Sequence, residues 1–227
     1  AAIRETWGKQ LRSRGVKLLF LVASTSDENL QDNIIEEDNI YGDLLQASFI
    51  EDYYNLTLKT IAMLDSLRNY CSQVKFVLKT DQDVLINVEK VFQVVDRYRN
   101  EQRAIFGNIF DNVVVRRNEN DKWYVPKFIY SPEYYPPYAS GPVYIFTGDS
   151  ISSLISEGFK TSALYVDDSY FTGIVAEKAG IKRIDIKLVS PFRIDKLKKT
   201  DFNKYLGIHN YKPGEIIKIW KTFGFMS

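Results

Sequence analysis

Hydrophobic residues along this chain gather in short runs, and longer segments with helical spacing separate these runs. Apolar runs that end at Gly, Ser, Thr or Asp are typical of buried strands. They predict strands at residues 16–23, 44–49, 74–80, 104–109, 143–147 and 182–189. Apolar positions with the i, i+3, i+4 spacing predict helices at residues 3–13, 27–38, 52–69, 87–99, 149–157, 166–180 and 212–223. Strands that alternate with helices indicate a single α/β domain.

Two stretches follow neither pattern. Residues 111–122 are polar and predict a loop or a hairpin. Residues 130–142 are dominated by tyrosine and proline and predict a rigid extended loop. Such a loop fits the aromatic wall of a substrate site and equally well a stiff surface connection, and composition alone does not choose between them.

Composition and net charge indicate which classes of protein this chain can belong to. The 227 residues are 45% hydrophobic, which is enough for a sizeable core. A net charge of +1 argues against a nucleic-acid partner, which would require a strongly basic face. The single Cys71 excludes a disulfide within the chain, and no apolar stretch approaches the about 20 residues that span a membrane. Because the chain starts without an initiator methionine, we expect a fragment or a trimmed domain.

A pair of acids follows the strand expected at 74–80. Asp81 and Asp83 are separated by one residue, and alternate residues of an extended segment point the same way. Two carboxylates on one side of a strand end suit a divalent cation that also touches phosphate. A solvated turn has the same letters, so the pair alone is a weak signal.

Two further features offer titratable groups. Asp167 and Asp168 begin the helix expected at 166–180, where acids also serve as ordinary caps. His209 is the only histidine of the chain, and a lone histidine is more often structural than a ligand. Taken singly, none of these features identifies a function.

The order of six sequence blocks is more specific than any one of them. They are IRETWG at 3–8, YGDLLQ with the following helix at 41–60, KTDQDVLIN at 79–87, YPPYASGPVY at 135–144, VDDSYFTG at 166–173 and HNYKP at 209–213. Together they span almost the whole chain, and the chain resembles the β-1,3-glycosyltransferases of family 31. That family contains galactosyl- and N-acetylglucosaminyltransferases related to Fringe.

The resemblance implies a GT-A fold, with a Rossmann-like mixed sheet flanked by helices. One catalytic domain would cover 1–227, shortened at its N-terminus, with a nucleotide-sugar half at about 1–110 and an acceptor half at about 111–227. It further implies an inverting hexosyltransferase that moves galactose or N-acetylglucosamine from a UDP-sugar to a glycan or glycoconjugate in β-1,3 linkage. Relatives are type II Golgi membrane proteins with a lumenal catalytic domain, so we expect a membrane anchor before Ala1.

The same resemblance assigns the donor side of the site. A manganese ion would bridge the acidic motif and the diphosphate, with Asp83 and His209 as its protein ligands. Asp81 would face the ribose side of the donor. Arg4 matches the family's nucleotide-binding arginine, whose guanidinium suits a diphosphate or the uridine.

The acceptor side is assigned in the same way. Asp168 matches the family's catalytic base, which takes the proton of the acceptor hydroxyl as this attacks the anomeric carbon. Asp167 matches its partner. The remaining residues expected to line the acceptor pocket are Tyr138, Ser140, Gly141 and Tyr144.

Some positions depart from the family pattern. Gln82 replaces the usual middle acid of the motif, and Val143 stands where a glycine is usual. Ala139 replaces a frequent cysteine, so a disulfide used by relatives is expected to be missing. These departures keep a second hypothesis open, namely a non-catalytic member that binds nucleotide-sugar or glycan or acts like a chaperone. Residues 55–57 form an N-glycosylation sequon inside an expected helix.

Overall fold

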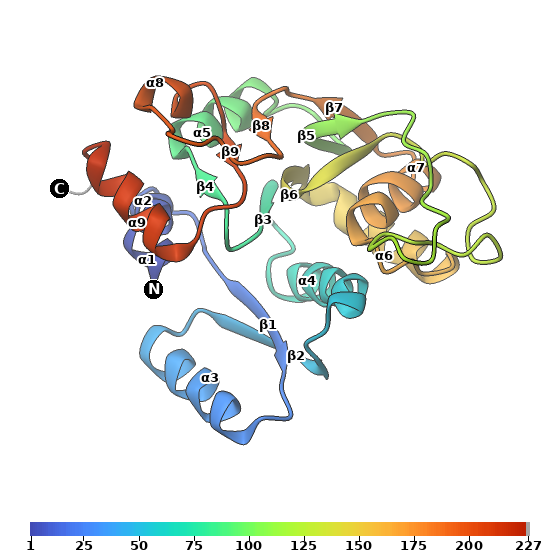
Figure 1. Cartoon of the computed structure of the whole chain (residues 1–227), viewed down its shortest axis with the longest axis horizontal. Coiled ribbons are helices and arrows are strands. Elements are labelled where there is room, and N and C mark those ends of the chain that lie inside the picture. The colour runs from blue at the N-terminus through green and yellow to red at the C-terminus, as the bar shows by residue number, and fades with distance from the viewer. Residues whose placement is uncertain (226–227) are drawn as a thin grey trace.

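A mixed four-stranded sheet forms the centre of the molecule (Figure 1). The computed structural model describes residues 1–225, so the last two residues of the expected domain lie outside the described part. The order of the central strands is β3 (Phe76–Thr80), β6 (Tyr138–Thr147), β5 (Ala104–Phe110) and β7 (Lys182–Asp185). Strand β6 is antiparallel to both β3 and β5, and β7 is parallel to β5.

Two smaller sheets flank the central one. The first joins β4 (Leu85–Ile86), β9 (Gly207–Ile208) and β8 (Val189–Ser190) in that order. The second is a parallel pair of β1 (Phe20–Ser24) and β2 (Leu44–Ile50). The first of these sheets matters for function, because β4 follows the acidic motif and β9 precedes the only histidine.

Helices lie on both faces of the central sheet. The helices of the described part are α1 (Ala2–Glu5), α2 (Trp7–Ser13), α3 (Glu28–Tyr41), α4 (Leu56–Tyr70), α5 (Val88–Arg97), α6 (Ile151–Lys160), α7 (Ala176–Lys178), α8 (Lys199–Phe202) and α9 (Pro213–Thr222), of which α3 lies away from this sheet. Short 3-10 turns η1 (Tyr53–Asn55) and η2 (Gly148–Ser150) precede α4 and α6, and a π-helix η3 (Ser169–Val175) precedes α7. None of the described helices combines the length and apolar character that a membrane crossing requires.

The central sheet separates two hydrophobic cores, because successive residues of a strand face opposite sides. On β6, Val143 and Ile145 join the core formed with α2, α5, α9 and the sheet of β4, β9 and β8. Tyr144 and Phe146 join the core formed with α4, α6 and the π-helix. This arrangement confirms the expected α/β fold with a mixed sheet between layers of helices.

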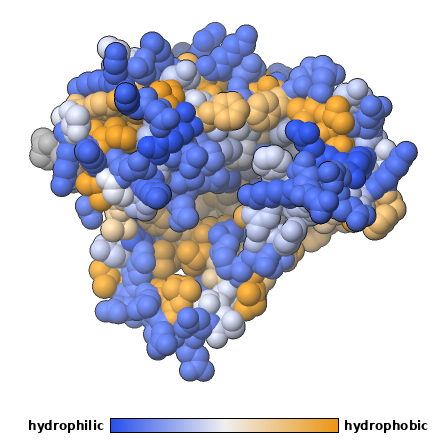
Figure 2. Space-filling view, viewed as in Figure 1, coloured by the Kyte–Doolittle hydropathy of each residue, from blue (hydrophilic) through white to orange (hydrophobic). Residues whose placement is uncertain are grey.

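A lobe of β1, β2 and α3 projects from this body (Figures 1 and 2). Helix α3 begins at Asp27, whose side chain accepts a hydrogen bond from the Leu30 amide at 3.2 Å. It ends at Gly42, which adopts the left-handed conformation with a φ of 60°. No residue of α3 is buried, so this lobe contributes little to either core.

The strands and helices expected from the sequence are largely present, but some boundaries were wrong. The expected loop at 130–142 ends early, because strand β6 already begins at Tyr138. Pairing of Tyr138 with Phe110 and of Ala139 with Ile109 extends this segment, although its small residues have little strand propensity of their own. The strand expected at 182–189 ends at Asp185 and resumes as β8. Short elements β4, β9 and α8 had no periodic signal long enough to predict them.

Candidate active site

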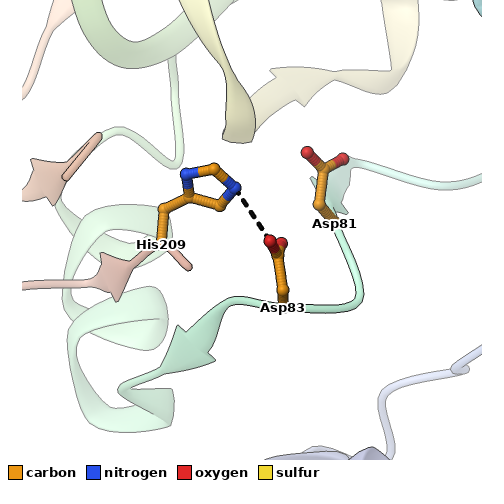
Figure 3. A group of neighbouring side chains, drawn as sticks. All are labelled: Asp81, Asp83 and His209. Atoms are coloured by element: carbon orange, nitrogen blue, oxygen red, sulfur yellow. Dashed lines mark ion pairs between the residues drawn. The ribbon is translucent and has the colours of Figure 1, made fainter. Parts of the chain in front are cut away.

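The acidic motif and the only histidine meet at one end of β3. Strand β4 pairs antiparallel with β9, with Leu85 opposite Ile208, so the residues just outside this pair are neighbours. The backbone amide of Tyr211 donates to the Asp83 carbonyl at 2.9 Å, which fixes this pairing. As a result His209 Nε2 lies 3.1 Å from Asp83 Oδ2 (Figure 3).

Asp81 completes a group of three possible ligands. One atom each from Asp81, Asp83 and His209 can be chosen so that all lie within 4.8 Å of one another. In Figure 3 the Asp83 carboxylate points at the imidazole, and the Asp81 carboxylate lies nearby. The other ring nitrogen of His209, Nδ1, lies 3.3 Å from the Pro191 carbonyl oxygen. That carbonyl can only accept, so Nδ1 carries a proton and the Nε2 position is left for a cation or a second proton.

The donor set therefore fits a divalent cation. Two carboxylates and an imidazole suit manganese when diphosphate and water oxygens complete the coordination. The carbonyl of Pro191 orients the His209 ring from behind, as outer-shell partners of metal-binding histidines do. Gln82, between the two acids, is exposed and is not part of the group.

Lys79 lies between this group and a second pair of acids. Its Nζ donates to Asp81 Oδ1 and to the Gly141 carbonyl oxygen, each at 2.6 Å. Burial by itself would lower the pKa of Lys79, but the charges of Asp81 and Asp167 outweigh burial and raise it. Lys79 thus remains a cation inside the site and neutralises part of the surrounding negative charge.

Asp168 is held by backbone donors at the start of the π-helix. Its Oδ1 accepts from the Ser169 amide at 2.7 Å, and its Oδ2 accepts from the Gly141 amide at 3.1 Å. Burial, followed by the charge of Asp167, raises the pKa of Asp168 to about 6. Because a general base works best with a pKa near the working pH, this carboxylate is suited to take up a proton.

Asp167 is hydrogen-bonded to a different element from Asp168. Its Oδ2 accepts a hydrogen bond from the Thr60 hydroxyl of α4 at 3.1 Å. Burial raises the pKa of Asp167 as well, and the positive charge of Lys79 opposes that rise. The two neighbouring acids therefore have different partners, one on α4 and one on β6.

Gly141 has no side chain, and the Asp168 carboxylate occupies the space next to its Cα. A Cβ on Gly141 would lie 3.1 Å from Asp168 Oδ2 and 3.4 Å from its Cβ, which is tight contact. The Gly141 carbonyl oxygen also accepts a hydrogen bond from Lys79, and the Gly141 amide donates one to Asp168. Gly141 thus connects Lys79, which lies beside the candidate cation ligands, to the candidate base Asp168.

Comparison with known proteins identifies the family of this chain. The family model described as Galactosyltransferase matches residues 1–187, most of the chain. The chain belongs to this galactosyltransferase family. A β-1,3-galactosyltransferase 1 from Homo sapiens is 30% identical over 222 residues, which cover 96% of this chain and 68% of the relative. A UDP-GlcNAc:betaGal β-1,3-N-acetylglucosaminyltransferase 7 from Rattus norvegicus is 30% identical over 234 residues, covering 96% of this chain and 59% of the relative.

Similar solved structures are more distant. A glycosyltransferase involved in glycosylation of the major capsid of PBCV-1 has a TM-score of 0.42 and 12% identity, over 91% of this chain and 100% of that one. A 4-diphosphocytidyl-2C-methyl-D-erythritol synthase has a TM-score of 0.47 and 11% identity, over 89% of this chain and 86% of that one. At these scores the likeness has no bearing on function.

In this galactosyltransferase-family chain, the residues expected to line the acceptor pocket lie at different depths. Tyr144 and Ser140 are buried in β6, and burial raises the pKa of Tyr144 well above its ordinary value. Tyr138 is half-buried, and burial together with the Asp168 carboxylate raises its pKa. The charge of the Asp168 carboxylate thus acts on both tyrosines, and of the two only Tyr138 is partly exposed. Their contact with an acceptor stays a prediction.

Arg4 lies away from the acids of the site. Its guanidinium donates to Asp43 at 2.6 and 2.8 Å and to Glu37 at 2.6 Å, and it stacks on Tyr41 at 4.0 Å from the ring centre. Only 8% of its side chain is exposed. In this structure Arg4 fastens the lobe of β1, β2 and α3 to the body, and its nucleotide-binding role stays a prediction.

Sequence reasoning missed two residues that hold the site together. Lys79 and Thr60 both lie inside the family blocks at 79–87 and 41–60, but neither was assigned a role. The signal that could have found Lys79 is a lysine two residues before an acid on an extended strand, since the two side chains then share a face. Nothing local identifies Thr60, whose partner Asp167 is 107 residues away.

Two departures from the family pattern lie in the core and not in the pocket. Val143 is completely buried, and its side chain packs directly over Gly207. Ala139 is completely buried beside Gly107. Both side chains therefore pack within the two cores. In the sequon, the Thr57 hydroxyl is buried and donates to the Leu164 carbonyl.

Proposed function

We propose that this chain is an inverting hexosyltransferase that transfers galactose or N-acetylglucosamine from a UDP-sugar to a glycan or glycoconjugate acceptor in β-1,3 linkage. The observation that supports it most is the connection of two unlike acid groups through the backbone of a single residue. Asp81, Asp83 and His209 form a group suited to a cation, and Asp168 is a carboxylate with a pKa of about 6. Gly141 lies between them and is bonded to Lys79 and to Asp168.

On the donor side, Asp83 and His209 would hold a divalent cation such as Mn²⁺, with Asp81 as a possible third contact. A cation at this position supplies positive charge against the negative charge that develops on the departing diphosphate. Lys79 holds the Asp81 carboxylate in place and keeps one positive charge beside it.

On the acceptor side, Asp168 takes the proton of the acceptor hydroxyl. The hydroxyl oxygen forms a bond to the anomeric carbon while the bond from that carbon to the diphosphate oxygen breaks, and UDP leaves. Attack from the face opposite the leaving group inverts the anomeric centre, so an α-linked donor gives a β-linked product. Asp167, fixed by Thr60, is placed to accept a hydrogen bond from a second acceptor hydroxyl.

The donor sugar is tested directly by a screen. The relatives at 30% identity include proteins named for galactose transfer and for N-acetylglucosamine transfer, so identity does not choose between these donors. Purified protein with Mn²⁺ is assayed with UDP-galactose, UDP-N-acetylglucosamine, UDP-glucose and UDP-N-acetylgalactosamine, with and without β-galactoside and β-N-acetylglucosaminide acceptors. We expect acceptor-dependent UDP release with one of the first two donors and a β-1,3 linkage in the product by NMR. Absence of UDP release with every donor and acceptor would overturn the proposal.

A second candidate is a member that binds a nucleotide-sugar without turnover. Gln82 in place of an acid favours it, because the motif then carries one negative charge less. Binding of UDP by calorimetry, together with no product on any acceptor, would support this candidate over transfer.

The family resemblance also leads us to propose action in the Golgi lumen. Immunolocalisation of the full-length protein tests this, and residence in another compartment would contradict it.

A further inference from the structure

A cavity of about 260 Å³ lies against residues 163–165, which lead into the candidate base, and has no assigned role. Its lining comes from the loop at 119–129, the segment at 163–165 and the turn η1 before α4. The residues that define its character are Tyr54, Glu119, Asp121, Tyr124, Ile129 and Tyr165. This volume is just below the roughly 300 Å³ at which small-molecule sites begin, so it suits a ligand the size of one sugar ring.

The walls of the cavity combine aromatic faces with carboxylates. The rings of Tyr54 and Tyr165 meet edge to face, with centres 5.0 Å apart. Tyr54 is 65% exposed, so its ring is available to a ligand. The Tyr165 hydroxyl donates to the carbonyls of Tyr124 and of Lys122, the latter at 3.2 Å, which fixes this wall to the 119–129 loop. Aromatic faces pack on the apolar side of a sugar ring, and carboxylates accept bonds from its hydroxyls.

The same framework carries the cavity and the base. Tyr165 precedes Asp168 by three residues, a span of about 10 Å at most for an extended chain. Helix α4 binds this segment twice, because Thr57 donates to the Leu164 carbonyl and Thr60 donates to Asp167. The cavity is thus held at a fixed short distance from the position where an acceptor hydroxyl would react.

Tyr53 extends the aromatic wall next to Tyr54. The two rings meet edge to face, with centres 5.9 Å apart. Burial raises the pKa of Tyr53, and the charges of Asp168 and Asp167 add to that rise. Tyr53 and Tyr54 thus form an aromatic pair that adjoins the cavity.

We infer that this cavity binds the sugar that precedes the reacting one in the acceptor, so that the acceptor is an oligosaccharide and not a single hexose. The inference rests on the proposed transfer function, because it extends the acceptor side of that site. The reacting sugar lies at Asp168, and the next sugar lies on Tyr54 between the carboxylates of Glu119 and Asp121.

The test compares acceptors of different length with a variant of the cavity. The acceptors are methyl β-galactoside and methyl β-N-acetylglucosaminide, and the disaccharides and tetrasaccharides that end in these sugars. Tyr54→Ala removes the exposed ring, and Tyr70→Ala, a 79% exposed tyrosine at the other end of α4, is the matched control.

For Tyr54→Ala we expect the KM for disaccharides and tetrasaccharides to rise roughly three- to tenfold, which is the loss of one aromatic contact. The kcat, the KM for methyl glycosides and the slow release of UDP into water should not change, because uniform binding affects KM alone. Tyr70→Ala should behave like the original protein. Equal KM values with all acceptor lengths in Tyr54→Ala and in the original protein would overturn the inference, as would an equal loss with methyl glycosides.

A direct binding measurement separates this inference from the proposed function. If no donor is transferred, saturation-transfer NMR with lactose and N-acetyllactosamine still reports binding at the cavity. Weaker binding of these disaccharides to Tyr54→Ala would then support the cavity while the transfer function fails. Indistinguishable binding to the two proteins would overturn the inference by itself.

Discussion

The two acid groups of this protein look alike in sequence and differ in their surroundings. Asp81 and Asp83 follow a strand end, and their side chains are 42% and 37% exposed. Asp167 and Asp168 precede a π-helix and are half-buried against α4 and β6, where burial raises the pKa of each. Carboxylates beside an imidazole suit a cation, whereas a carboxylate with a raised pKa suits a proton. The environment, and not the residue type, separates the two roles.

Lys79 and Gly141 join the two groups. The ammonium of Lys79 contacts Asp81 and the Gly141 carbonyl, and the Gly141 amide contacts Asp168. A change at one group can therefore alter the other, because the Lys79 side chain and the Gly141 backbone connect them. The following variants test how far the two groups are separate.

The largest effect is expected for Asp168→Asn. Transfer should fall by about 10²- to 10⁴-fold, because an amide cannot take up the acceptor proton. Binding of UDP should persist, because the Asp83 and His209 side chains are unchanged. Transfer by the original protein should decline as the pH falls through about 6, where Asp168 becomes protonated.

Stability gives Asp168→Asn an independent measurement. Folding raises the pKa of Asp168, so its ionised form reduces stability more and more as the pH rises from about 4 to 6. The amide removes that cost but loses one of two backbone hydrogen bonds, worth about 1 kcal/mol. The unfolding temperature should therefore stay within about 4 °C at neutral pH. Asp32→Asn on the exposed α3 is the matched control. Full transfer by Asp168→Asn would exclude Asp168 as the base.

His209→Ala tests the other group. It should weaken Mn²⁺ binding at least by the roughly 10- to 100-fold that loss of an outer-shell partner costs. Electron paramagnetic resonance of free Mn²⁺ measures this, with the 77% exposed Asp96→Asn as control. An unchanged Mn²⁺ affinity and an unchanged metal dependence of transfer would show that His209 is not a ligand.

Lys79→Met tests the link between the groups. Transfer should fall roughly tenfold, the equivalent of one hydrogen bond to a charged group. The charge of Lys79 lowers the pKa of Asp168, so its loss should move the acid limb of the pH profile to higher pH. Lys79→Arg keeps the charge and should return the limb toward its original position. If the acid limb of the pH profile is identical in the original protein, Lys79→Met and Lys79→Arg, then Lys79 contributes packing and does not tune the pKa of Asp168.

The smallest effect is expected for Gly141→Ala. The added Cβ at 3.1 Å from Asp168 Oδ2 must displace that carboxylate by a few tenths of an ångström. We expect transfer to fall about three- to tenfold with Mn²⁺ binding unchanged, because small misplacements of a catalytic group cost rate. Gly214→Ala at the start of α9 meets nothing within 4 Å and is the matched control. Equal transfer by the two variants would show that Asp168 tolerates displacement.

Much of the fold could be predicted from local patterns. The apolar runs near 76–80 and 104–110 and the helical spacing near 88–97 each specify one element, because a strand or a helix repeats over a few residues. Prediction failed where pairing overrides propensity, as at Tyr138–Pro142, which is held extended by β5. It also failed for two-residue strands, which are too short to show a period.

For the site, the sequence by itself determined the residue types and their order. The order of six sequence blocks indicated the family, and three of those blocks carry the acids at 81 and 83, the pair at 167 and 168 and the later histidine. Tertiary structure alone decided that His209 lies against Asp83, because this depends on the pairing of β4 with β9 across more than a hundred residues. It also decided that burial and the charge of Asp167 raise the pKa of Asp168. A pKa depends on burial and on neighbouring charges, and both are properties of distance in space and not of distance along the chain.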